Sequence, residues 1–499
     1  MPSYSLITFG CQMNQHDSER MEEVLRRAGY VPSEGVEQAD VVLLNTCSVR
    51  EKAEQKLRSE VGRLGVLKRR RPELMIGVAG CVAQQEGERL LRKMPQIDLL
   101  VGPDHIASLP AVLRELEGGA PPQVLAGFDV EAPRFLSAEP GALGRQAVSA
   151  FVTVMKGCDE RCSFCIVPTT RGPERYRPAR EIVAECTLLV QAGAREITLL
   201  GQTVDSYLDP ERSLTPAPAD APLIAEARSR RGAGLSHDVS EFPALLRAIA
   251  EATPALARLR YTSPHPRHLT PQLICAHREL PVLARHVHMP VQSGSDAVLR
   301  RMIRRYSVAE YLERTGRLRE AVPGLTLSTD VIVGFPGETD ADFQATLDLV
   351  EQVGFVGVFG FKYSERPGTA ALKFEDDVPE AVKSARLTAL FERSERLQRA
   401  HLAALVGSVQ AVLVEGPGKT GGYSGRTSRN EIVHLGASAD VTGELCQVKI
   451  VSAYKHSLLG ELVDAARRAP PPAPGERGAQ GPGEPPRAEL RGRVSLPVV

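Results

Sequence analysis

Apolar runs alternate with helical patterns along the N-terminal part of the chain. Strand patterns occur at residues 4–9, 40–45, 74–79 and 98–101. Between them, apolar positions recur with helical spacing, for example over residues 17–28. Uninterrupted apolar strands that alternate with helices are typical of a parallel sheet covered on both faces. We therefore predict a doubly wound α/β domain over residues 1–135, followed by a linker at 139–144.

The same alternation continues at greater length over residues 145–377. Six strand patterns are separated by helical patterns and lie at 150–156, 196–200, 258–262, 286–291, 325–333 and 355–363. Six consecutive βα units predict a partial (β/α)6 barrel, in which functional residues lie at the carboxyl ends of the strands. Residues 209–240 are rich in Pro, Ala, Ser and Arg, and we predict that they form a surface insertion in the second unit.

The pattern changes after a long helical stretch at 378–405. Short alternating strands separated by Gly-rich turns follow, and they predict a small antiparallel β-barrel over residues 406–463. Barrels of this kind often hold nucleic acid, although a plain structural β-domain has the same pattern. Residues 464–499 are dominated by Pro, Gly and charged residues, which predicts a disordered tail.

Composition narrows the class of protein. The chain has 499 residues, enough for about three domains, and a formal net charge of zero, so a surface that binds nucleic acid must be local. No apolar run reaches the length of a membrane span and no signal peptide precedes the first strand, so we expect a cytoplasmic protein without a membrane partner. In that reducing compartment, the nine cysteines indicate metal or redox chemistry rather than disulfides.

Three cysteines form the motif C-x3-C-x2-C directly after the first strand of the central region. These residues, Cys158, Cys162 and Cys165, are called the barrel triad below. A cubane iron–sulfur cluster has four irons, so three thiolates leave one iron open for chemistry. The alternatives are a zinc site or three core cysteines, but zinc sites use paired C-x2-C units or histidines, and only Cys186, in a helical pattern, follows nearby. The spacing favours an iron–sulfur cluster.

A second set of cysteines is dispersed in sequence but equivalent in position. Cys11, Cys47 and Cys81, called the N-terminal triad below, each follow directly on a predicted parallel strand. The carboxyl ends of such strands share one edge of the sheet, where ligands bind. Gly10 and Gly80 would let the backbone approach a bulky cofactor. Three independent core cysteines are the alternative, but the repeated placement favours a second cluster.

Seven stretches, spread in order over the three predicted domains, carry a family resemblance. They are T-F-G-C-Q-M-N at 8–14, N-T-C-S-V-R-E-K-A at 45–53, G-C-V-A-Q at 80–84, the cysteine loop at 157–172, H-M-P-V-Q-S-G-S at 288–295, D-V-I-V-G-F-P-G-E-T at 330–339 and G-R-T-S-R-N at 425–430. The first six resemble motifs of the radical-SAM methylthiotransferases. The last resembles the signature turn of the TRAM domain, an RNA-binding β-barrel. The resemblance covers about residues 3–463.

The resemblance implies two [4Fe-4S] clusters and S-adenosyl-L-methionine (SAM) as cofactors. The cluster on the barrel triad would bind SAM at its open iron and, when reduced, cleave it to a 5′-deoxyadenosyl radical that removes hydrogen from C2 of an adenine. The cluster on the N-terminal triad would present a sulfur, which a second SAM molecule methylates. The resemblance implies no catalytic residue beyond these cluster ligands.

The implied substrate is a tRNA. Within the family, residues 10–19 and 45–53 favour the branch that adds a methylthio group to C2 of N6-(dimethylallyl)adenosine at position 37. The implied partners are the anticodon stem-loop, with its base turned out of the stack, and a small electron donor such as flavodoxin or ferredoxin. The alternatives are a sister enzyme for threonylcarbamoyl-adenosine or a ribosomal-protein aspartate, and a non-catalytic RNA-binding iron–sulfur protein.

Further candidate residues lie at strand ends and in the C-terminal barrel. Those for SAM contacts are Gln202, Gln292, Ser293 and Glu338. Each of them is equally consistent with a helix cap or a turn. Candidates for contacts with RNA phosphates, which are equally consistent with solvated surface charge, are Arg426, Arg429 and Lys455. At 201–205 the chain reads G-Q-T-V-D, which departs from the family's G-Q-N-V-N pattern and puts fine substrate contacts in doubt.

Overall fold

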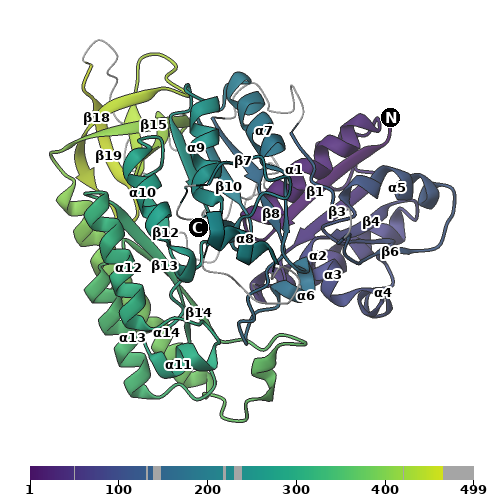
Figure 1. The fold of residues 1–499 in the computed structure, drawn as a ribbon. Coiled ribbons are helices and arrows are strands. Elements are labelled where there is room, and N and C mark those ends of the chain that lie inside the picture. The colour runs from purple at the N-terminus through teal and green to yellow at the C-terminus, as the bar shows by residue number, and fades with distance from the viewer. Residues whose placement is uncertain are drawn as a thin grey trace, which may run out of the picture.

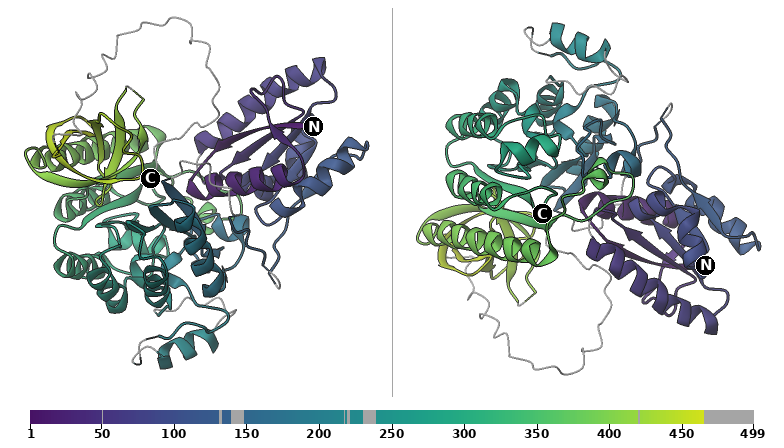
Figure 2. Two further views of the ribbon diagram at one scale, coloured as in Figure 1. Left: turned by 90° about the horizontal axis from the view of Figure 1, so that it is seen from above. Right: turned by 90° about the horizontal axis from the view of Figure 1, so that it is seen from below.

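The computed structural model describes residues 1–49, 51–130, 133–138, 148–216, 218, 221–229, 239–419 and 421–464. In Figures 1 and 2, an N-terminal sheet with helices and a small C-terminal β-barrel lie on different sides of a central βα region. The predicted linker at 139–144, part of the predicted insertion and the tail beyond 464 lie outside the described residues. No helix in the described part of the chain is both long and apolar enough to cross a membrane.

The N-terminal domain is a parallel sheet with helices on both faces, as predicted, but it has six strands. Its strands are β1 (Ser3–Phe9), β2 (Val31–Pro32), β3 (Val41–Thr46), β4 (Met75–Ala79), β5 (Leu99–Val101) and β6 (Gln123–Leu125), in the order β2-β1-β3-β4-β5-β6, and the sequence pattern missed β2 and β6. One face packs on α1 (Gln12–Arg27), η1 (Ile106–Ser108) and α5 (Leu109–Glu117). The other packs on α2 (Glu51–Arg70), α3 (Cys81–Glu86) and α4 (Glu88–Lys93). Side chains alternate accordingly, with Leu43 on the first face and Leu44 on the second.

The strand order places a topological switch point between β1 and β3. The chain passes from β1 outward to β2 and then returns to β3 on the other side of β1. Helices on the two sides of such a point lie on opposite faces, which leaves a crevice beyond the carboxyl ends of the strands.

The central region is a partial βα barrel, as predicted. Its six parallel strands are β7 (Ser149–Thr153), β10 (Glu196–Leu200), β11 (Arg258–Tyr261), β12 (His286–His288), β13 (Thr326–Val333) and β14 (Gly357–Lys362). They form two three-stranded sheets, which a parallel bridge between Leu259 and Leu283 connects. Two further two-residue strands, β8 (Met155–Lys156) and β9 (Arg175–Tyr176), pair with each other in antiparallel orientation.

Helices and short turns alternate with the barrel strands. They are α6 (Val167–Arg171), α7 (Ala179–Gln191), η2 (Val204–Ser206), α8 (Ala221–Ser229), α9 (Phe242–Ala252), η3 (Pro266–His268), α10 (Pro271–Glu279), α11 (Asp296–Arg301), α12 (Val308–Ala321), α13 (Asp340–Val353) and η4 (Ala370–Lys373). Within the predicted insertion, α8 lies at the outer edge of the central region (Figure 2).

A 25-residue helix, α14 (Glu380–Ala404), leads from the central region to the C-terminal barrel. Five strands close that barrel in the order β15-β16-β17-β19-β18: β15 (Val409–Pro417), β16 (Tyr423–Thr427), β17 (Ile432–Gly436), β18 (Leu445–Ala453) and β19 (Leu458–Leu462). Four neighbouring pairs are antiparallel, as expected, but β17 and β19 pair in parallel. The sequence pattern missed β16 and β19 because Gly425 and Gly460 interrupt their alternation. A Cβ on Gly425 would lie 2.3 Å from the Leu413 carbonyl oxygen, so close strand approach requires this glycine.

Candidate cluster sites at the domain interface

The N-terminal triad gathers at the switch point. Cys11 caps the N-terminus of α1 directly after β1, Cys47 directly follows β3, and Cys81 opens α3 directly after β4 and Gly80. Because β1, β3 and β4 are neighbours in register, the three thiols come from adjacent strand ends. The prediction that these cysteines share one edge is therefore confirmed for their backbone positions.

Two of these thiols are in direct contact. Cys47 donates a hydrogen bond to Cys11, which lowers the pKa of Cys11 to about 6 and raises that of Cys47 well above its usual range. Burial raises the pKa of Cys81, and the nearby guanidinium of Arg171 opposes that shift. Since a metal-binding cysteine must be a thiolate, Cys11 is the group most ready to ligate.

Two buried asparagines and a glycine shape this site. Asn14 Nδ2 donates to Asn45 Oδ1 over 3.0 Å, and Asn45 Nδ2 donates to the Asn14 carbonyl over 2.7 Å. The Cys11 thiol donates to Asn14 Oδ1 over 3.3 Å. Gly80 has a φ of +86°, and a Cβ there would lie 2.3 Å from Asn45 Oδ1. The asparagine pair can therefore approach the turn before Cys81 only because residue 80 is glycine.

An arginine from the central region completes the N-terminal site. Arg171, the last residue of α6, donates from Nε to Cys81 Sγ over 3.3 Å and from Nη2 to Asp17 Oδ2 over 2.6 Å. Its side chain is 3% exposed. Sequence reasoning missed this residue, although it lies in the 157–172 cysteine loop that resembles the family.

The barrel triad lies on the loop between β8 and α6. Thr203 Oγ1 is 3.0 Å from Cys158 Sγ, and Arg304 Nη1 donates to Cys162 Sγ over 3.3 Å. The Cys165 amide donates to the Cys162 carbonyl over 3.0 Å, which forms a tight turn within the motif. Burial raises the pKa of Cys158 well above its usual range and that of Cys165 to about 12. Binding iron would deprotonate both thiols.

The donor sets are of the kind that iron–sulfur clusters use, because each thiolate of a cubane site binds a different iron. No group of three or more His, Cys, Asp or Glu side chains in the described ranges is arranged to hold a metal ion. Each triad supplies only sulfur donors, and each has one buried arginine bound to a sulfur, Arg171 or Arg304. Such hydrogen bonds to cluster sulfurs suit an anionic cluster.

Buried acids surround the barrel triad, and sequence reasoning did not single them out. Burial raises the pKa of Glu174 to about 7 and that of Asp205 to about 7. Glu174 accepts hydrogen bonds from the Tyr176 hydroxyl and, over 3.1 Å, from Ser206 Oγ. Asp205 Oδ1 accepts from the His265 amide over 2.9 Å. The departure from the family pattern at Asp205 was the signal that could have drawn attention to this group.

Three of the four predicted SAM residues lie just after the carboxyl ends of barrel strands. Gln202 Oε1 accepts from the Gly157 amide over 2.6 Å, which places it beside the barrel triad. Gln292 has a φ of +73° and bonds through its backbone to β13. Ser293 Oγ is buried and accepts from the Ser295 amide over 3.2 Å. Their contacts with SAM stay predictions.

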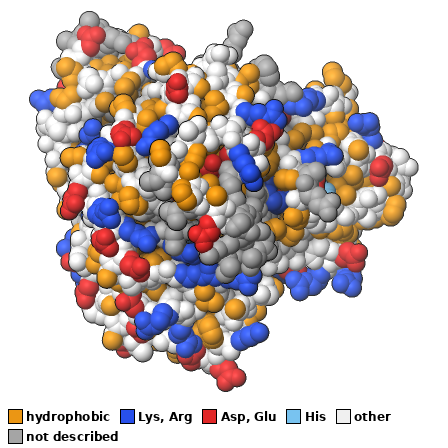
Figure 3. Space-filling model, in the orientation of Figure 1, with side chains coloured by type: hydrophobic (Ala, Val, Ile, Leu, Met, Phe, Trp, Pro, Cys, Tyr) orange, Lys and Arg blue, Asp and Glu red, His pale blue; other side chains and the backbone are white. Residues whose placement is uncertain are grey.

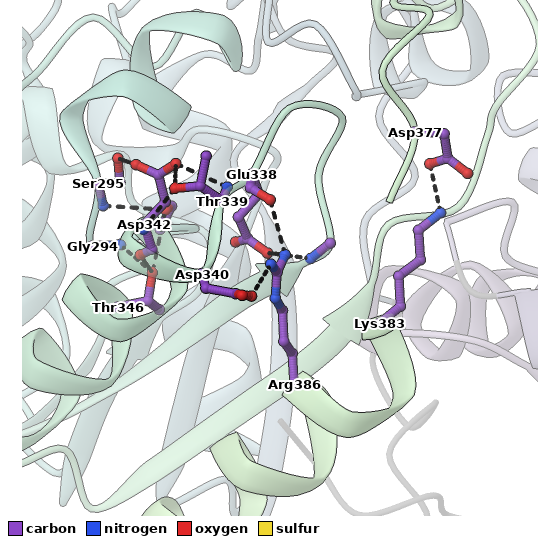
Figure 4. A network of polar contacts seen from close by, with 12 residues as sticks. Gly294, Ser295, Glu338, Thr339, Asp340, Asp342, Thr346, Asp377, Lys383 and Arg386 are labelled. Atoms are coloured by element: carbon purple, nitrogen blue, oxygen red, sulfur yellow. Dashed lines mark hydrogen bonds and ion pairs between the residues drawn. The ribbon is translucent and has the colours of Figure 1, made fainter. Parts of the chain in front are cut away.

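Glu338 makes a different set of contacts. It accepts from the Gly334 amide over 2.6 Å and from Arg386 Nη1 of α14 over 2.7 Å. Asp340 Oδ1 accepts from Arg386 Nη2 over 2.8 Å, so one arginine ties the turn after β13 to α14 (Figure 4). Both bonds reach Oε2, whereas Glu338 Oε1 is buried and has no hydrogen-bond partner in the described structure, and the contact of Glu338 with SAM stays a prediction.

The TRAM-like turn docks on the central region. Arg258 and Arg260 of β11 donate to backbone carbonyls of Arg426 and Thr427 over 3.1 Å each. Arg258 is the first residue of β11, so the turn packs against the amino ends of the barrel strands, whereas the barrel triad lies beyond their carboxyl ends.

The predicted RNA-binding side chains all have acidic partners. Arg426 Nε lies 3.0 Å from Glu415, and Arg429 Nε lies 2.9 Å from Glu431. Lys455 Nζ lies 2.7 Å from Glu395, and the lysine side chain is 51% exposed. Their RNA contacts stay predictions, and Lys455 is the member of the set whose charge is accessible.

Buried polar contacts fix the N-terminal domain against the barrel. Lys156 Nζ bonds to Asp104 Oδ1 over 3.0 Å, and burial lowers the pKa of that lysine. Arg175 also binds Asp104, and Thr153 Oγ1 lies 3.2 Å from His16 Nδ1. Thr153 ends β7, the strand that precedes the barrel triad, and His16 lies on α1, the helix that follows Cys11. These two elements of different domains are therefore in direct contact.

The matches to family models agree with this three-domain architecture. Residues 3–102 match the family model described as "Uncharacterized protein family UPF0004", residues 152–350 match the Radical SAM superfamily and residues 403–463 match the TRAM domain. A solved structure of the radical S-adenosylmethionine methyltransferase TsrM from Kitasatospora setae is 15% identical, with a TM-score of 0.49, over 74% of this chain and 74% of that chain.

Two curated relatives cover nearly the whole chain. The tRNA-2-methylthio-N(6)-dimethylallyladenosine synthase of Sorangium cellulosum is 61% identical over 100% of this chain and 99% of its own length. The protein of the same name from Acidithiobacillus ferrooxidans is 46% identical over 92% of this chain and 97% of its own length. With three matching domains in order and this degree of identity, the chain belongs to the family of the tRNA-2-methylthio-N(6)-dimethylallyladenosine synthases.

Proposed function

We propose that this protein adds a methylthio group to C2 of N6-(dimethylallyl)adenosine at position 37 of tRNA. The names of the full-length relatives support this reaction and this substrate. The observation on which the proposal rests is the pair of three-thiol sets, one after the strands of each domain and both beside the interface between the domains. Two such centres would let one activate a carbon–hydrogen bond while the other holds the sulfur to be delivered.

The cofactors follow from the two triads. Membership in the Radical SAM superfamily implies SAM and a [4Fe-4S] cluster, and we assign that cluster to Cys158, Cys162 and Cys165. A second [4Fe-4S] cluster on Cys11, Cys47 and Cys81 is our proposal. When bound, these groups supply the radical that breaks the C2–H bond and the sulfur that replaces the hydrogen.

The chain's own residues hold and orient these groups. The hydrogen-bonded Cys11–Cys47 pair and the Asn14–Asn45 pair keep the N-terminal thiols at one edge of the sheet. Gln202 and Thr203 contact the backbone and sulfur of the barrel loop, where SAM contacts are proposed for Gln202, Gln292 and Ser293. Cys47 and Cys81 are buried and the other four triad cysteines are half-buried, which limits access of water and protects reactive species from quenching.

We propose two partners: the anticodon stem-loop with its modified adenosine, and a small electron donor such as flavodoxin or ferredoxin. We also propose that the protein acts in the cytoplasm. Lysines and arginines are interspersed with acids over the face in Figure 3, and the formal net charge of the chain is zero. Affinity for RNA would therefore come from local groups such as Lys455.

Three measurements test the proposal. Anaerobically reconstituted protein should hold about eight irons per chain, and substitution of the N-terminal triad by alanine should leave about four. Both proteins should cleave SAM under reduction, but only the intact one should methylthiolate tRNA. Intact protein that holds about four irons would contradict the second cluster, and failure to cleave SAM would favour a non-catalytic RNA-binding protein.

Nucleoside mass spectrometry of a deletion strain identifies the substrate. We expect 2-methylthio-N6-dimethylallyladenosine to disappear and N6-(dimethylallyl)adenosine to accumulate. Loss of the methylthio group from threonylcarbamoyl-adenosine or from a ribosomal-protein aspartate, with the dimethylallyl nucleoside intact, would assign the chain to a sister reaction.

A further inference from the structure

Each triad has one buried arginine that donates to one of its sulfurs, and the two arginines differ in how fully they are bonded. Arg304 donates to Cys162 Sγ, to the Pro290 carbonyl over 3.1 Å and to the Tyr306 hydroxyl over 3.2 Å. These bonds use Nη1, Nη2 and Nε. Arg171 uses Nε for Cys81 and Nη2 for Asp17, while its Nη1 is buried and has no hydrogen-bond partner in the described structure.

A buried guanidinium nitrogen without an acceptor is costly. Leaving a buried donor unsatisfied costs about 1–3 kcal/mol, and more for a charged group. Native structures rarely tolerate this unless a water, an ion or a cofactor supplies the missing acceptor. The charge of Arg171 acts on both Cys11 and Cys81, so the unsatisfied donor belongs to a guanidinium placed among the N-terminal thiols.

Arg171 and its partners belong to different domains. Arg171 ends α6, the helix that follows the barrel triad, yet its partners Asp17 and Cys81 lie on α1 and α3 of the N-terminal domain. Its ion pair with Asp17 is buried on both sides, with side chains 3% and 8% exposed. Asp17 therefore fixes the orientation of a cation that the central region presents to the N-terminal site.

We propose that Arg171 is a positioning residue of the N-terminal cluster, and that its Nη1 donates a hydrogen bond to sulfur held there. This inference rests on the proposed function, because it requires a cluster on Cys11, Cys47 and Cys81. The guanidinium stabilises the more negative, reduced state of the cluster and the anionic form of a sulfur at its open iron. Each of the three guanidinium nitrogens of Arg304 already has an acceptor, so this residue serves as the matched control at the other cluster.

The test isolates one cluster at a time. A variant in which alanine replaces the barrel triad retains only the N-terminal cluster, whose reduction is followed by EPR in a potentiometric titration. In this background, Arg171→Gln should lower the ratio of reduced to oxidised cluster at a fixed potential by roughly tenfold. This change corresponds to a fall of about 59 mV in the one-electron reduction potential of the cluster. Arg171→Lys keeps the charge and should recover most of the shift, and Arg304→Gln should leave the titration unchanged.

The outcomes separate the inference from the proposed function. If no cluster assembles in the background variant with Arg171 intact, the proposed N-terminal cluster is wrong, and this inference is wrong with it. If the cluster assembles and Arg171→Gln titrates like its parent, only the inference is overturned. Loss of the cluster in Arg171→Gln with retention in Arg171→Lys supports it. Loss in both, in protein that keeps its far-UV circular dichroism, assigns Arg171 to packing and overturns the electrostatic role.

Discussion

Glu338 forms a buried ion pair with Arg386 over 2.7 Å, and this pair joins the turn after β13 to the helix that leads out of the barrel (Figure 4). The side chains are 0% and 7% exposed, respectively. Burial raises the pKa of Glu338, and the hydrogen bonds from Gly334 and Arg386 oppose that shift. The carboxylate is thus positioned by α14 from one side and by its own turn from the other.

Removing one partner of this pair should destabilise the protein. Arg386→Met leaves the Glu338 carboxylate buried without its cation, which we expect to cost about 3–5 kcal/mol and to lower the melting temperature by several degrees. Equilibrium dialysis of the reconstituted protein should show unchanged SAM affinity. If Glu338 is instead a SAM ligand, Glu338→Gln will weaken SAM binding more than it lowers the melting temperature.

The neighbouring pair in Figure 4 supplies a control. Lys383 Nζ lies 2.7 Å from Asp377, whose side chain is 57% exposed. Lys383→Met removes the cation and leaves an exposed carboxylate that water can solvate, so the loss of this pair should change stability by about 1 kcal/mol or less. Equal effects of Arg386→Met and Lys383→Met would show that burial does not control the strength of these pairs.

Substitution of Gly80 should disrupt the N-terminal triad selectively. Gly80→Ala adds a Cβ at 2.3 Å from Asn45 Oδ1 and 2.9 Å from the Thr46 carbonyl, and it also forces alanine to a φ of +86°. We expect the reconstituted protein to lose about half of its iron while it still cleaves SAM. Iron analysis and a SAM-cleavage assay check this result.

Gly29→Ala is the matched control for backbone strain. Gly29 has a φ of +90°, but nothing lies within 4 Å of a Cβ there. Both variants therefore bear the cost of a left-handed alanine, and only Gly80→Ala meets the asparagine pair. Loss of iron in both variants would mean that general destabilisation, rather than the clash, removes the cluster.

Most elements and the positions of the triad cysteines could be predicted from the sequence because both depend on local pattern, whereas short or Gly-interrupted strands such as β16 and β19 were missed. Apolar runs give strands, and a cysteine directly after a parallel strand must lie at the carboxyl edge of the sheet. The partners of charged side chains depend on tertiary contacts instead. Arg304 is 142 residues from Cys162 and Arg171 is 154 residues from Asp17, and no periodicity links such positions. Glu338 illustrates the same limit, because its position at a strand end fitted a ligand contact equally well.

Accessible charge in the C-terminal barrel can be tested through salt dependence. Lys455→Ala should weaken tRNA binding and reduce the slope of log K against log salt by roughly 0.7–0.9, because one fewer counterion is released. Glu395→Gln removes the ion-pair partner of this lysine but keeps its charge, so its slope should equal that of the wild type. Fluorescence anisotropy at several salt concentrations measures both. An unchanged slope in Lys455→Ala would remove this residue from the RNA interface.

Buried histidines should make the fold sensitive to acid in a defined window. Burial lowers the pKa of His277 to about 4, and its Nε2 lies 2.7 Å from the Tyr261 hydroxyl. In the unfolded chain, this histidine has a pKa near 6.5, so between pH 6.5 and 4 the unfolded state holds more protons than the folded state. The contribution of His277 to the free energy of unfolding is therefore fully present above pH 6.5 and is lost as the pH falls toward 4. From pH 7.5 to 5.5, this histidine should contribute a loss of about 1 kcal/mol.

The comparison with His277→Gln isolates this contribution. His16 and His265 are also buried and His286 is half-buried, and all three have lowered pKa values, so the wild type should lose more stability than one histidine accounts for. Glutamine does not titrate and can keep a hydrogen bond to Tyr261, so the melting temperature of the variant should fall less between pH 7.5 and 5.5. Because both proteins carry the same cysteine triads, acid sensitivity of the clusters cancels in the difference. Parallel pH profiles for the two proteins would show that His277 is already protonated in the folded state or is accessible to water.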